Sequence, residues 1–126
     1  MNDRFKYRVW DKLLNKMVYL SGFSEHDGVF TLYVGDGGFF TRTDNQIELE
    51  QCTGLKDKYN TLIFEGDVLE DRDGNKYVVS WHDKMATFCI SRKEWRHIHY
   101  FYEGIDPVNV KRVGSIHQHQ HKHLLE

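Results

Sequence analysis

The segment VLEDRDGNKYVVSWHDKMATFCIS, residues 68–91, has the clearest structural pattern in the chain. Its Asp73-Gly74 pair is typical of hairpin turns and predicts that residues 68–72 pair with residues 76–82. Asp83-Lys84 can reverse the chain again, into a third antiparallel strand over residues 85–91. Alternation along the second and third strands predicts one buried face, made of Tyr77, Val79, Trp81, Ala86, Phe88 and Ile90.

The N-terminal half also favours strands, because it is rich in aromatic and β-branched residues. Phe5, Tyr7 and Val9 alternate with basic residues and should face a core. Two β-prone runs, residues 29–34 and 39–43, flank a glycine-rich turn and predict a second hairpin.

The remaining N-terminal segments give weaker patterns. We expect a short strand over residues 17–19 and a loop over residues 21–28, and residues 62–64 form a short apolar run. Ile47, Leu49 and Gln51 alternate with Glu48 and Glu50, so one face should be buried and both carboxylates should lie in water.

The C-terminal third leaves a choice between strand and helix. Ser91 to Glu94 fits the S-x-x-E capping box that begins many helices, but residues 95–102 (WRHIHYFY) are aromatic and β-prone. We favour a strand over residues 95–102, with a helix as the alternative. A last strand is expected over residues 108–116, with Val110 and Val113 in the core.

Length and composition exclude several classes of protein. The 126 residues, 40% of them apolar, suffice for one globular domain or two very small ones. No apolar run reaches the roughly 18 residues of a membrane-spanning helix, and the N-terminus lacks a signal-peptide core, so we expect a cytoplasmic protein. Two cysteines, Cys52 and Cys89, fit a reducing compartment. The net charge of −2 argues against non-specific nucleic-acid binding.

We expect a mainly β fold (β-rich α+β) in a single domain over residues 1–126. No repeat or linker divides the chain, but a soft boundary near Gly54 separates an N-terminal β region, residues 1–53, from a small barrel, residues 54–116. Residues 117–126 form a His-rich tail. Each half is too short to be comfortably stable alone, so the two are expected to pack together.

Several blocks of sequence carry a resemblance to a known family. They are YRVWD at residues 7–11, CTGLKDK at 52–58, IFEGDV at 63–68, VSW at 79–81 and VGSI at 113–116. In order and spacing these blocks cover nearly the whole chain. The sequence resembles the YopX-type family of small phage and prophage proteins.

The resemblance implies a mostly β protein of the host cytoplasm, encoded among phage accessory genes, with an SH3-like barrel in its second half. It implies no reaction, because the family has no established catalytic residues. Gly54 and Gly66 are interpreted as turn residues, and Trp10 and Trp81 as core residues.

The C-terminus departs from this family pattern. Relatives tend to continue with an Asn-Pro-Glu-Leu-Leu segment, whereas this chain has a His-rich run that ends in Leu125-Glu126. Leu-Glu commonly precedes an engineered hexahistidine tag, so part of the tail is interpreted as a remnant of such a tag.

Alternating histidines are the first candidates for metal binding. In a strand, His117, His119, His121 and His123 would project from one face and could bind Zn²⁺ or Ni²⁺. A terminal low-complexity tract rarely provides a closed coordination sphere, so we favour adventitious affinity over a native site.

A second histidine set lies in the C-terminal half. His97 and His99 would share a strand face, with His82 nearby in sequence, and could serve a metal-dependent enzyme. We favour a solvated polar face opposite Ile98, Tyr100 and Tyr102.

Cysteine chemistry is the next candidate. Cys52 or Cys89 could act as a nucleophile beside His82 or His99, but spacing does not show a base held by a third group. Cys89 lies in a strand between apolar neighbours, so we favour a semi-buried structural role.

Paired carboxylates could ligate Mg²⁺ or share a proton. No D-x-D-x-D-G loop completes any pair, so solvated edges and turns are the simpler interpretation. The pairs are Glu48 and Glu50, Asp71 and Asp73, and Glu65 and Asp67.

Basic residues interleaved with aromatic ones could bind nucleic acid by phosphate contact and base stacking. These residues are Lys6, Tyr7 and Arg8, and Arg92, Lys93, Trp95, Arg96 and Tyr100. The acidic excess of the whole chain opposes this function. Gly35-Asp36-Gly37-Gly38 is no phosphate loop, because no Lys-Ser/Thr follows it.

We therefore expect a non-catalytic protein, with no catalytic residues, metal or cofactor, that binds another protein or copies of itself through strand edges and aromatic surface. A nucleic-acid-binding small barrel is the alternative. A metal-dependent enzyme that uses His82, His97 and His99 is the third hypothesis.

Overall fold

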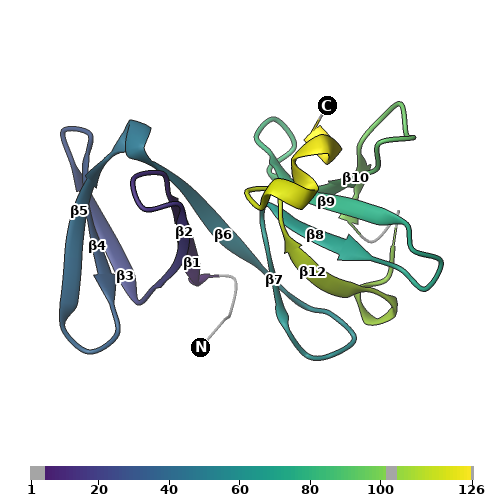
Figure 1. Ribbon diagram of the computed structural model, residues 1–126, viewed down its shortest axis with the longest axis horizontal. Helices are drawn as coiled ribbons and strands as arrows, with labels where there is room; N and C mark the ends of the chain where they lie inside the picture. The colour runs from purple at the N-terminus through teal and green to yellow at the C-terminus, as the bar shows by residue number, and fades with distance from the viewer. Residues whose placement is uncertain (1–4, 102–104, 126) are drawn as a thin grey trace. The chain divides into compact units, whose positions relative to one another are not determined.

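The computed structural model describes residues 5–101 and 105–125, which are mostly strands joined by turns and short 3-10 helices (Figure 1). This confirms the mainly β fold class. The chain divides into two compact units, Met1–Cys52 and Thr53–Glu126. The boundary expected between residues 53 and 54 lies one residue from this division.

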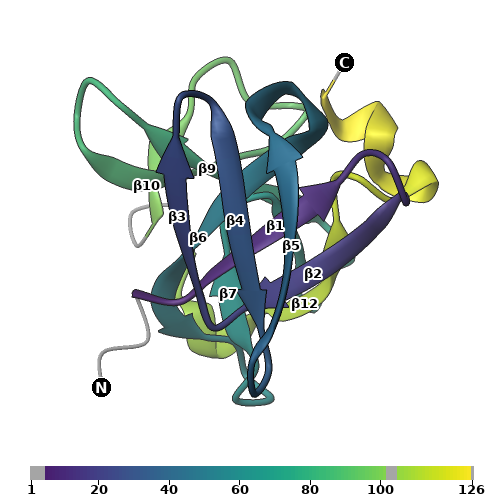
Figure 2. The ribbon, with the colours of Figure 1, turned by 90° about the vertical axis from the view of Figure 1, so that its left-hand side faces the viewer.

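The first unit holds two antiparallel sheets. One contains β2 (Lys16–Leu20), β1 (Tyr7–Asp11) and the start of β6 (Ile47–Lys56), in that order. The other has the order β3 (Gly22–His26), β4 (Val29–Val34) and β5 (Gly38–Thr43). Figure 2 shows β3, β4 and β5 side by side, with β1 and β2 crossing behind them.

Apolar side chains fill the space between these two sheets. Val9, Leu32 and Ile47 are the buried centre of this core, and Phe23, Phe30 and Phe40 pack against it. The expected hairpin between residues 29–34 and 39–43 is confirmed by the pairing of β4 with β5.

One segment of the first unit was predicted wrongly, because residues 21–28 contain strand β3 instead of a loop. Phe23 is the only large apolar residue of this strand, and it packs edge-on against the Tyr7 ring at 5.1 Å. A single buried side chain gives no periodic pattern, so the strand is defined by its pairing with β4.

Two ion pairs involve residues of β1, one within its own sheet and one with β5 of the other sheet. Arg8 is fully buried, and its Nε donates to Glu50 Oε1 at 2.8 Å. Asp11 is also fully buried and accepts from Arg42 Nε and Nη2 at 3.0 and 2.9 Å. Hydrogen bonding by Arg42 lowers the pKa of Asp11, so this stabilisation is present at neutral pH and is lost on strong acidification.

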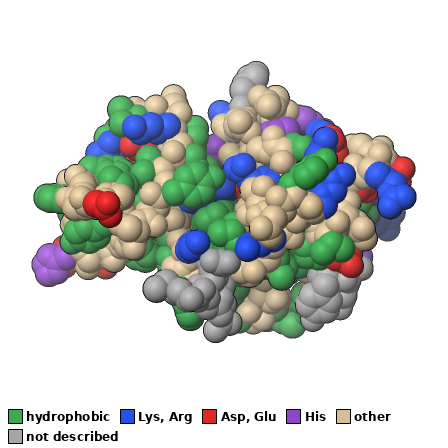
Figure 3. Space-filling view, turned by 90° about the horizontal axis from the view of Figure 1, so that it is seen from below, with side chains coloured by type: hydrophobic (Ala, Val, Ile, Leu, Met, Phe, Trp, Pro, Cys, Tyr) green, Lys and Arg blue, Asp and Glu red, His purple; other side chains and the backbone are tan. Residues whose placement is uncertain are grey.

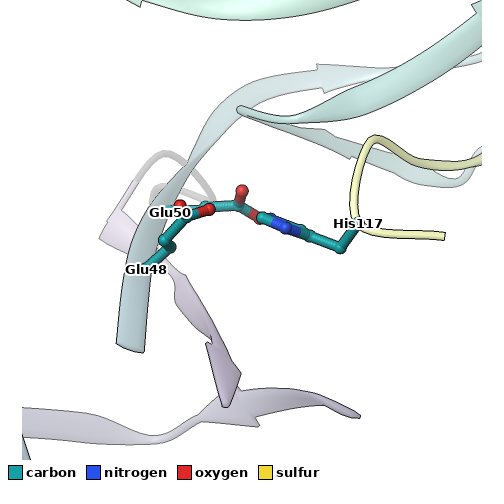
Figure 4. A group of neighbouring side chains, drawn as sticks. All are labelled: Glu48, Glu50 and His117. Atoms are coloured by element: carbon teal, nitrogen blue, oxygen red, sulfur yellow. The ribbon is translucent and has the colours of Figure 1, made fainter. Parts of the chain in front are cut away.

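Two expectations for the first unit are wrong. Glu48 is exposed, but Glu50 is 4% exposed and does not lie in water, although both project from β6 (Figure 4). Phe5 was expected in the core and is 59% exposed. The buried carboxylate is tolerated because Arg8 supplies both charge and a hydrogen bond.

The second unit is built on a five-stranded sheet with the order β11-β10-β9-β8-β12. The strands are β8 (Asp67–Glu70), β9 (Lys76–His82), β10 (Thr87–Ser91), β11 (His99–Tyr100) and β12 (Lys111–Ser115). The three antiparallel strands expected in series are confirmed as β8, β9 and β10. Figure 1 shows that this sheet is strongly curled. The expected SH3-like barrel stays a prediction.

The core of this unit follows the predicted alternation along β9 and β10. Its buried members are Ile63 of β7 (Leu62–Phe64), Leu69, Tyr77, Val79, Ile90, Phe101 and Val110. Trp81, expected there, is 38% exposed and packs on Phe88 at 5.0 Å. Trp10, expected in the core of the first unit, is half-buried. Ala86 is not on the buried face, because it lies in a turn with φ of 52°.

The strand expected over residues 95–102 is wrong for most of its length. Only His99–Tyr100 form a strand, and Tyr102 lies outside the described residues. Trp95 instead ends a turn, with its N–H donated to the Arg92 carbonyl, and its ring packs edge-on against Tyr77 at 5.6 Å. The last strand begins at Lys111, because Pro107–Asn109 form a 3-10 turn capped by Asp106.

Two buried carboxylates join the chain segments that flank β7. Asp57 accepts the N–H groups of Tyr59 and Thr61 at 2.9 Å and that of Arg112 at 2.8 Å. Asp67 is fully buried, accepts the Phe64 N–H at 2.7 Å, and lies 2.9 Å from Arg112 Nε. Arg112 of β12 therefore contacts both acidic residues, through its backbone and through its guanidinium group.

We predict that Asp57→Asn lowers the free energy of unfolding of the second unit by about 1–3 kcal/mol, because an amide cannot accept three N–H groups with both of its terminal atoms. Urea unfolding followed by tryptophan fluorescence measures the change. Asp73→Asn is the matched control, since Asp73 lies exposed in a turn and should shift stability by less than about 0.5 kcal/mol. Equal urea midpoints for Asp57→Asn and wild type would contradict this role of Asp57.

Candidate functional site

A pocket of about 280 Å³ lies in the second unit, at the ends of β9, β10 and β11. His82, Met85, Cys89, Ile98, His99 and Tyr100 line it. Strand register explains this grouping, because Thr87 pairs with His82 and Cys89 pairs with Tyr100. The structure thus brings together Cys89, His82 and His99, which the sequence had suggested as a nucleophile with candidate bases.

The local bonds of these residues show what the pocket can do. His82 Nδ1 accepts the Met85 N–H at 3.2 Å, so the neutral ring carries its proton on Nε2. Cys89 is 1% exposed, and its thiol lies 4.0 Å from the Thr87 carbonyl oxygen, to which it can donate. A buried thiol that donates a hydrogen bond is stabilised in its protonated form, which is the poorer nucleophile.

His99 lines the pocket but is engaged by a neighbouring ring, and the remaining members of the two groups, His97 and Cys52, lie elsewhere. His99 packs edge-on against the Trp95 ring at 4.4 Å, and His97 is exposed and does not line the pocket. Cys52 is fully buried and belongs to the first unit. The proposed set of His82, His97 and His99 is therefore not assembled around one pocket.

The C-terminal histidines do not share one strand face, because residues His119–Leu125 form a 3-10 helix, η4. His121 is 5% exposed, whereas His123 is exposed. His117 is half-buried, and the side chain of His119 lies outside the described part of the chain. The alternating sequence pattern therefore does not become a row of four metal ligands.

Asp71 and Asp73 belong to a turn, in which the Asp71 carboxylate accepts backbone N–H groups. Asp71 Oδ1 accepts the N–H groups of Asp73 and Asn75 at 3.0 Å, and its Oδ2 accepts the Tyr77 hydroxyl at 2.8 Å. Burial opposes ionisation of Asp71, but the bonds from Asn75 and Tyr77 outweigh it and lower the pKa. A pocket of about 290 Å³ beside this turn is acidic, yet both Asp71 oxygens are already engaged.

The pair of Glu65 and Asp67 is also structural. Asp67 binds the Phe64 N–H and Arg112, as described above, and Gly66 between the two acids has a φ of 85°. The turn role predicted for Gly66 therefore agrees with its backbone, while full burial of Asp67 contradicts a solvated turn. Gly54 also has a positive φ, 83°, but lies inside β6.

The basic and aromatic residues proposed for nucleic-acid binding are partly internal. Arg8 is buried against Glu50. Arg92 lies over the rings of Tyr77 and Trp95, at 5.5 and 5.8 Å, and donates to Asn75 Oδ1 at 3.0 Å. Lys93 and Arg96 are exposed. On the face drawn in Figure 3, basic side chains are dispersed among other types and form no continuous stripe.

The fold also forms a surface that the sequence patterns did not indicate, here called the outer sheet face. It is the side of β3, β4 and β5 turned away from the core, toward the viewer in Figure 2. Cross-strand register places nine residues on it: Gly22, Ser24, His26, Val29, Thr31, Tyr33, Phe39, Thr41 and Thr43. The alternation in VFTLYV was a usable signal, but the loop expected at residues 21–28 concealed the third strand.

We predict that neither cysteine reacts with Ellman's reagent in the folded protein, because Cys52 and Cys89 are 0% and 1% exposed. In urea both free thiols should react, and Cys89→Ser should leave one. Rapid reaction of one thiol in native protein, absent from Cys89→Ser, would show that the pocket exposes Cys89 and would restore the nucleophile hypothesis.

Comparisons with known proteins agree with the mostly β fold. A solved structure, protein EF1440 from Enterococcus faecalis, matches with a TM-score of 0.56 and 19% identity, over 96% of this chain and 97% of that one. No match was found among curated proteins. Among the described residues, no helix has the length and apolarity needed to cross a membrane.

A comparison with family models identifies the relatives. The model described as YopX protein matches residues 6–126, a range that includes the histidine-rich C-terminus. The resemblance seen in the TGLKDK and EGDV blocks is thereby confirmed. The chain belongs to the YopX protein family.

Proposed function

We propose that this protein is a non-catalytic phage or prophage accessory module that acts in the host cytoplasm and self-associates through the outer sheet face. The observation that carries the proposal is the composition of that face. None of its nine residues is Asp, Glu, Lys or Arg, although charged residues make up 29% of the chain.

The face combines apolar and hydroxyl groups. Tyr33 and Phe39 are cross-strand partners with ring centroids 6.2 Å apart, and they are 42% and 65% exposed. Val29 is 43% exposed at the other end of β4. Exposed aromatic residues on a regular sheet supply large contact area with little loss of side-chain entropy, which suits protein association.

Charged residues on these strands are directed away from the outer sheet face. Arg42 of β5 turns inward and pairs with Asp11, and Glu25 of β3 accepts the Gly28 N–H at 2.8 Å. Two copies of a face that lacks Asp, Glu, Lys and Arg can meet with little like-charge repulsion, as an isologous dimer requires. Nucleic acid would instead need Lys or Arg on the face for phosphate contact.

We predict that the wild-type protein elutes as a dimer and that Phe39→Glu makes it monomeric, because the substitution places two carboxylates in one interface. Size exclusion with light scattering measures both masses. Tyr59→Glu is the matched control, since Tyr59 is equally exposed, at 68%, but lies in the second unit. This variant should remain dimeric.

A monomeric wild type at all accessible concentrations, or a dimer that Phe39→Glu leaves intact, would contradict the proposal. A salt-dependent filter-binding titration with DNA and RNA examines the alternative, small-barrel nucleic-acid binding. A binding constant that falls steeply with salt would support that alternative.

A further inference from the structure

The C-terminal segment, residues 117–125, packs against β12 through a buried histidine. His121 is 5% exposed, and neither ring nitrogen makes a hydrogen bond of normal geometry to a described residue. Buried polar groups are nearly always hydrogen-bonded, so this imidazole is an exception that needs an explanation. The site lies outside the outer sheet face and outside the Cys89 pocket.

Gly114 in β12 provides the space that the segment occupies. A Cβ at this position would overlap Gln118 Oε1 and lie 2.9 Å from His121 Nε2. Its φ of +155° lies at the edge of the glycine-favoured region. The glycine of the VGSI block is therefore needed for close approach of the C-terminal segment.

Hydrogen bonds hold the C-terminal segment beside β12. Gln118 Oε1 accepts the Ser115 N–H at 3.0 Å, and the His121 N–H is donated to the Gln118 carbonyl at 2.9 Å. The Ile116 N–H is donated to the Gly66 carbonyl at 2.9 Å. These bonds give the docked segment several amides whose protection from exchange can be measured.

The charges around His121 come from three strands and from its own segment. Lys76 of β9 and His123 disfavour a positive ring, whereas Glu70 of β8 favours one. Glu70 is paired with both Lys76 and Lys111 of β12, which reduces its effect on the ring. Burial is the largest influence and lowers the pKa of His121, with the Val113 backbone opposing it.

We propose that residues 117–125 form a pH-sensitive strap, docked on β12 while the His121 ring is neutral and released when that ring gains a proton. A protonated imidazole would be a buried cation beside Lys76, without an acidic partner of its own. Because the docked state binds fewer protons than the released state, docking is complete above pH about 6.5 and weakens as the pH falls below that value.

Hydrogen exchange of the full-length protein, at pH 7.5 and 5.0 in the presence of EDTA, tests the strap. After correction for intrinsic exchange rates, protection of the amides of Ser115, Gln118 and His121 should fall at pH 5.0, by at most about thirty-fold for one histidine. Amides of β9 should keep their protection. His121→Phe, which fills the site with a neutral ring, should abolish the fall, and His123→Gln should retain it.

Unchanged protection of the segment in wild type, or an equal fall in His121→Phe, would overturn the proposal. If His121→Phe fails to dock at either pH, NMR titration of wild type decides the question. A pKa of His121 below that of exposed His97 supports the strap, and an equal or higher value overturns it.

Discussion

The second unit depends on one arginine that meets two buried carboxylates. Arg112 gives its backbone N–H to Asp57 and its guanidinium to Asp67, residues separated by the whole of β7. An unpaired buried carboxylate would be costly, so Asp67 depends on the guanidinium group of Arg112. Asp57 depends instead on backbone N–H groups, among them that of residue 112. The same two acids lie in the TGLKDK and EGDV blocks, which gives these family blocks a structural explanation: they close the loops around β7 and attach β12.

The first unit uses charge in a related way. Arg8 with Glu50 and Arg42 with Asp11 place their charges inside the unit, where each group has a defined partner. In the Asp11 pair, two guanidinium N–H groups of Arg42 reach one carboxylate, which fixes the geometry of the pair. Directing Arg42 inward also leaves the opposite face of β5 to Phe39, Thr41 and Thr43. Internal ion pairing and an outer sheet face without Asp, Glu, Lys or Arg are thus two results of one strand register.

Strands with strong alternation and standard turns could be predicted from the sequence. The β8-β9-β10 series and the β4-β5 hairpin follow from Asp73-Gly74, from the glycine cluster at residues 35–38, and from period-two patterns. Elements whose own residues show no periodic pattern could not be predicted. Strand β3 has one large apolar residue, Phe23, and is defined by its pairing with β4. The ring of Trp95 packs on Tyr77, which is distant in sequence.

The candidate sites show the same limit. Local sequence suggested Cys89, His82 and His99 together, and strand register does place all three around one pocket. The alternation of the sequence did not show which side chains are exposed, however. Arg8, Glu50 and Asp67 occupy positions that look solvent-facing, but partners far along the chain bury them. Long-range pairing of charges decides these positions, and a local pattern contains no information about it.

The register shift in β12 between Arg112 and Gly114 has a consequence for aggregation. β12 is an outer strand of the five-stranded sheet, and an exposed flat edge can template open-ended polymerisation. A bulge interrupts the regular spacing of donors and acceptors that an incoming strand must match. Fibril growth from this edge is thereby disfavoured, and Lys111 at the start of the strand adds a charge to the same edge.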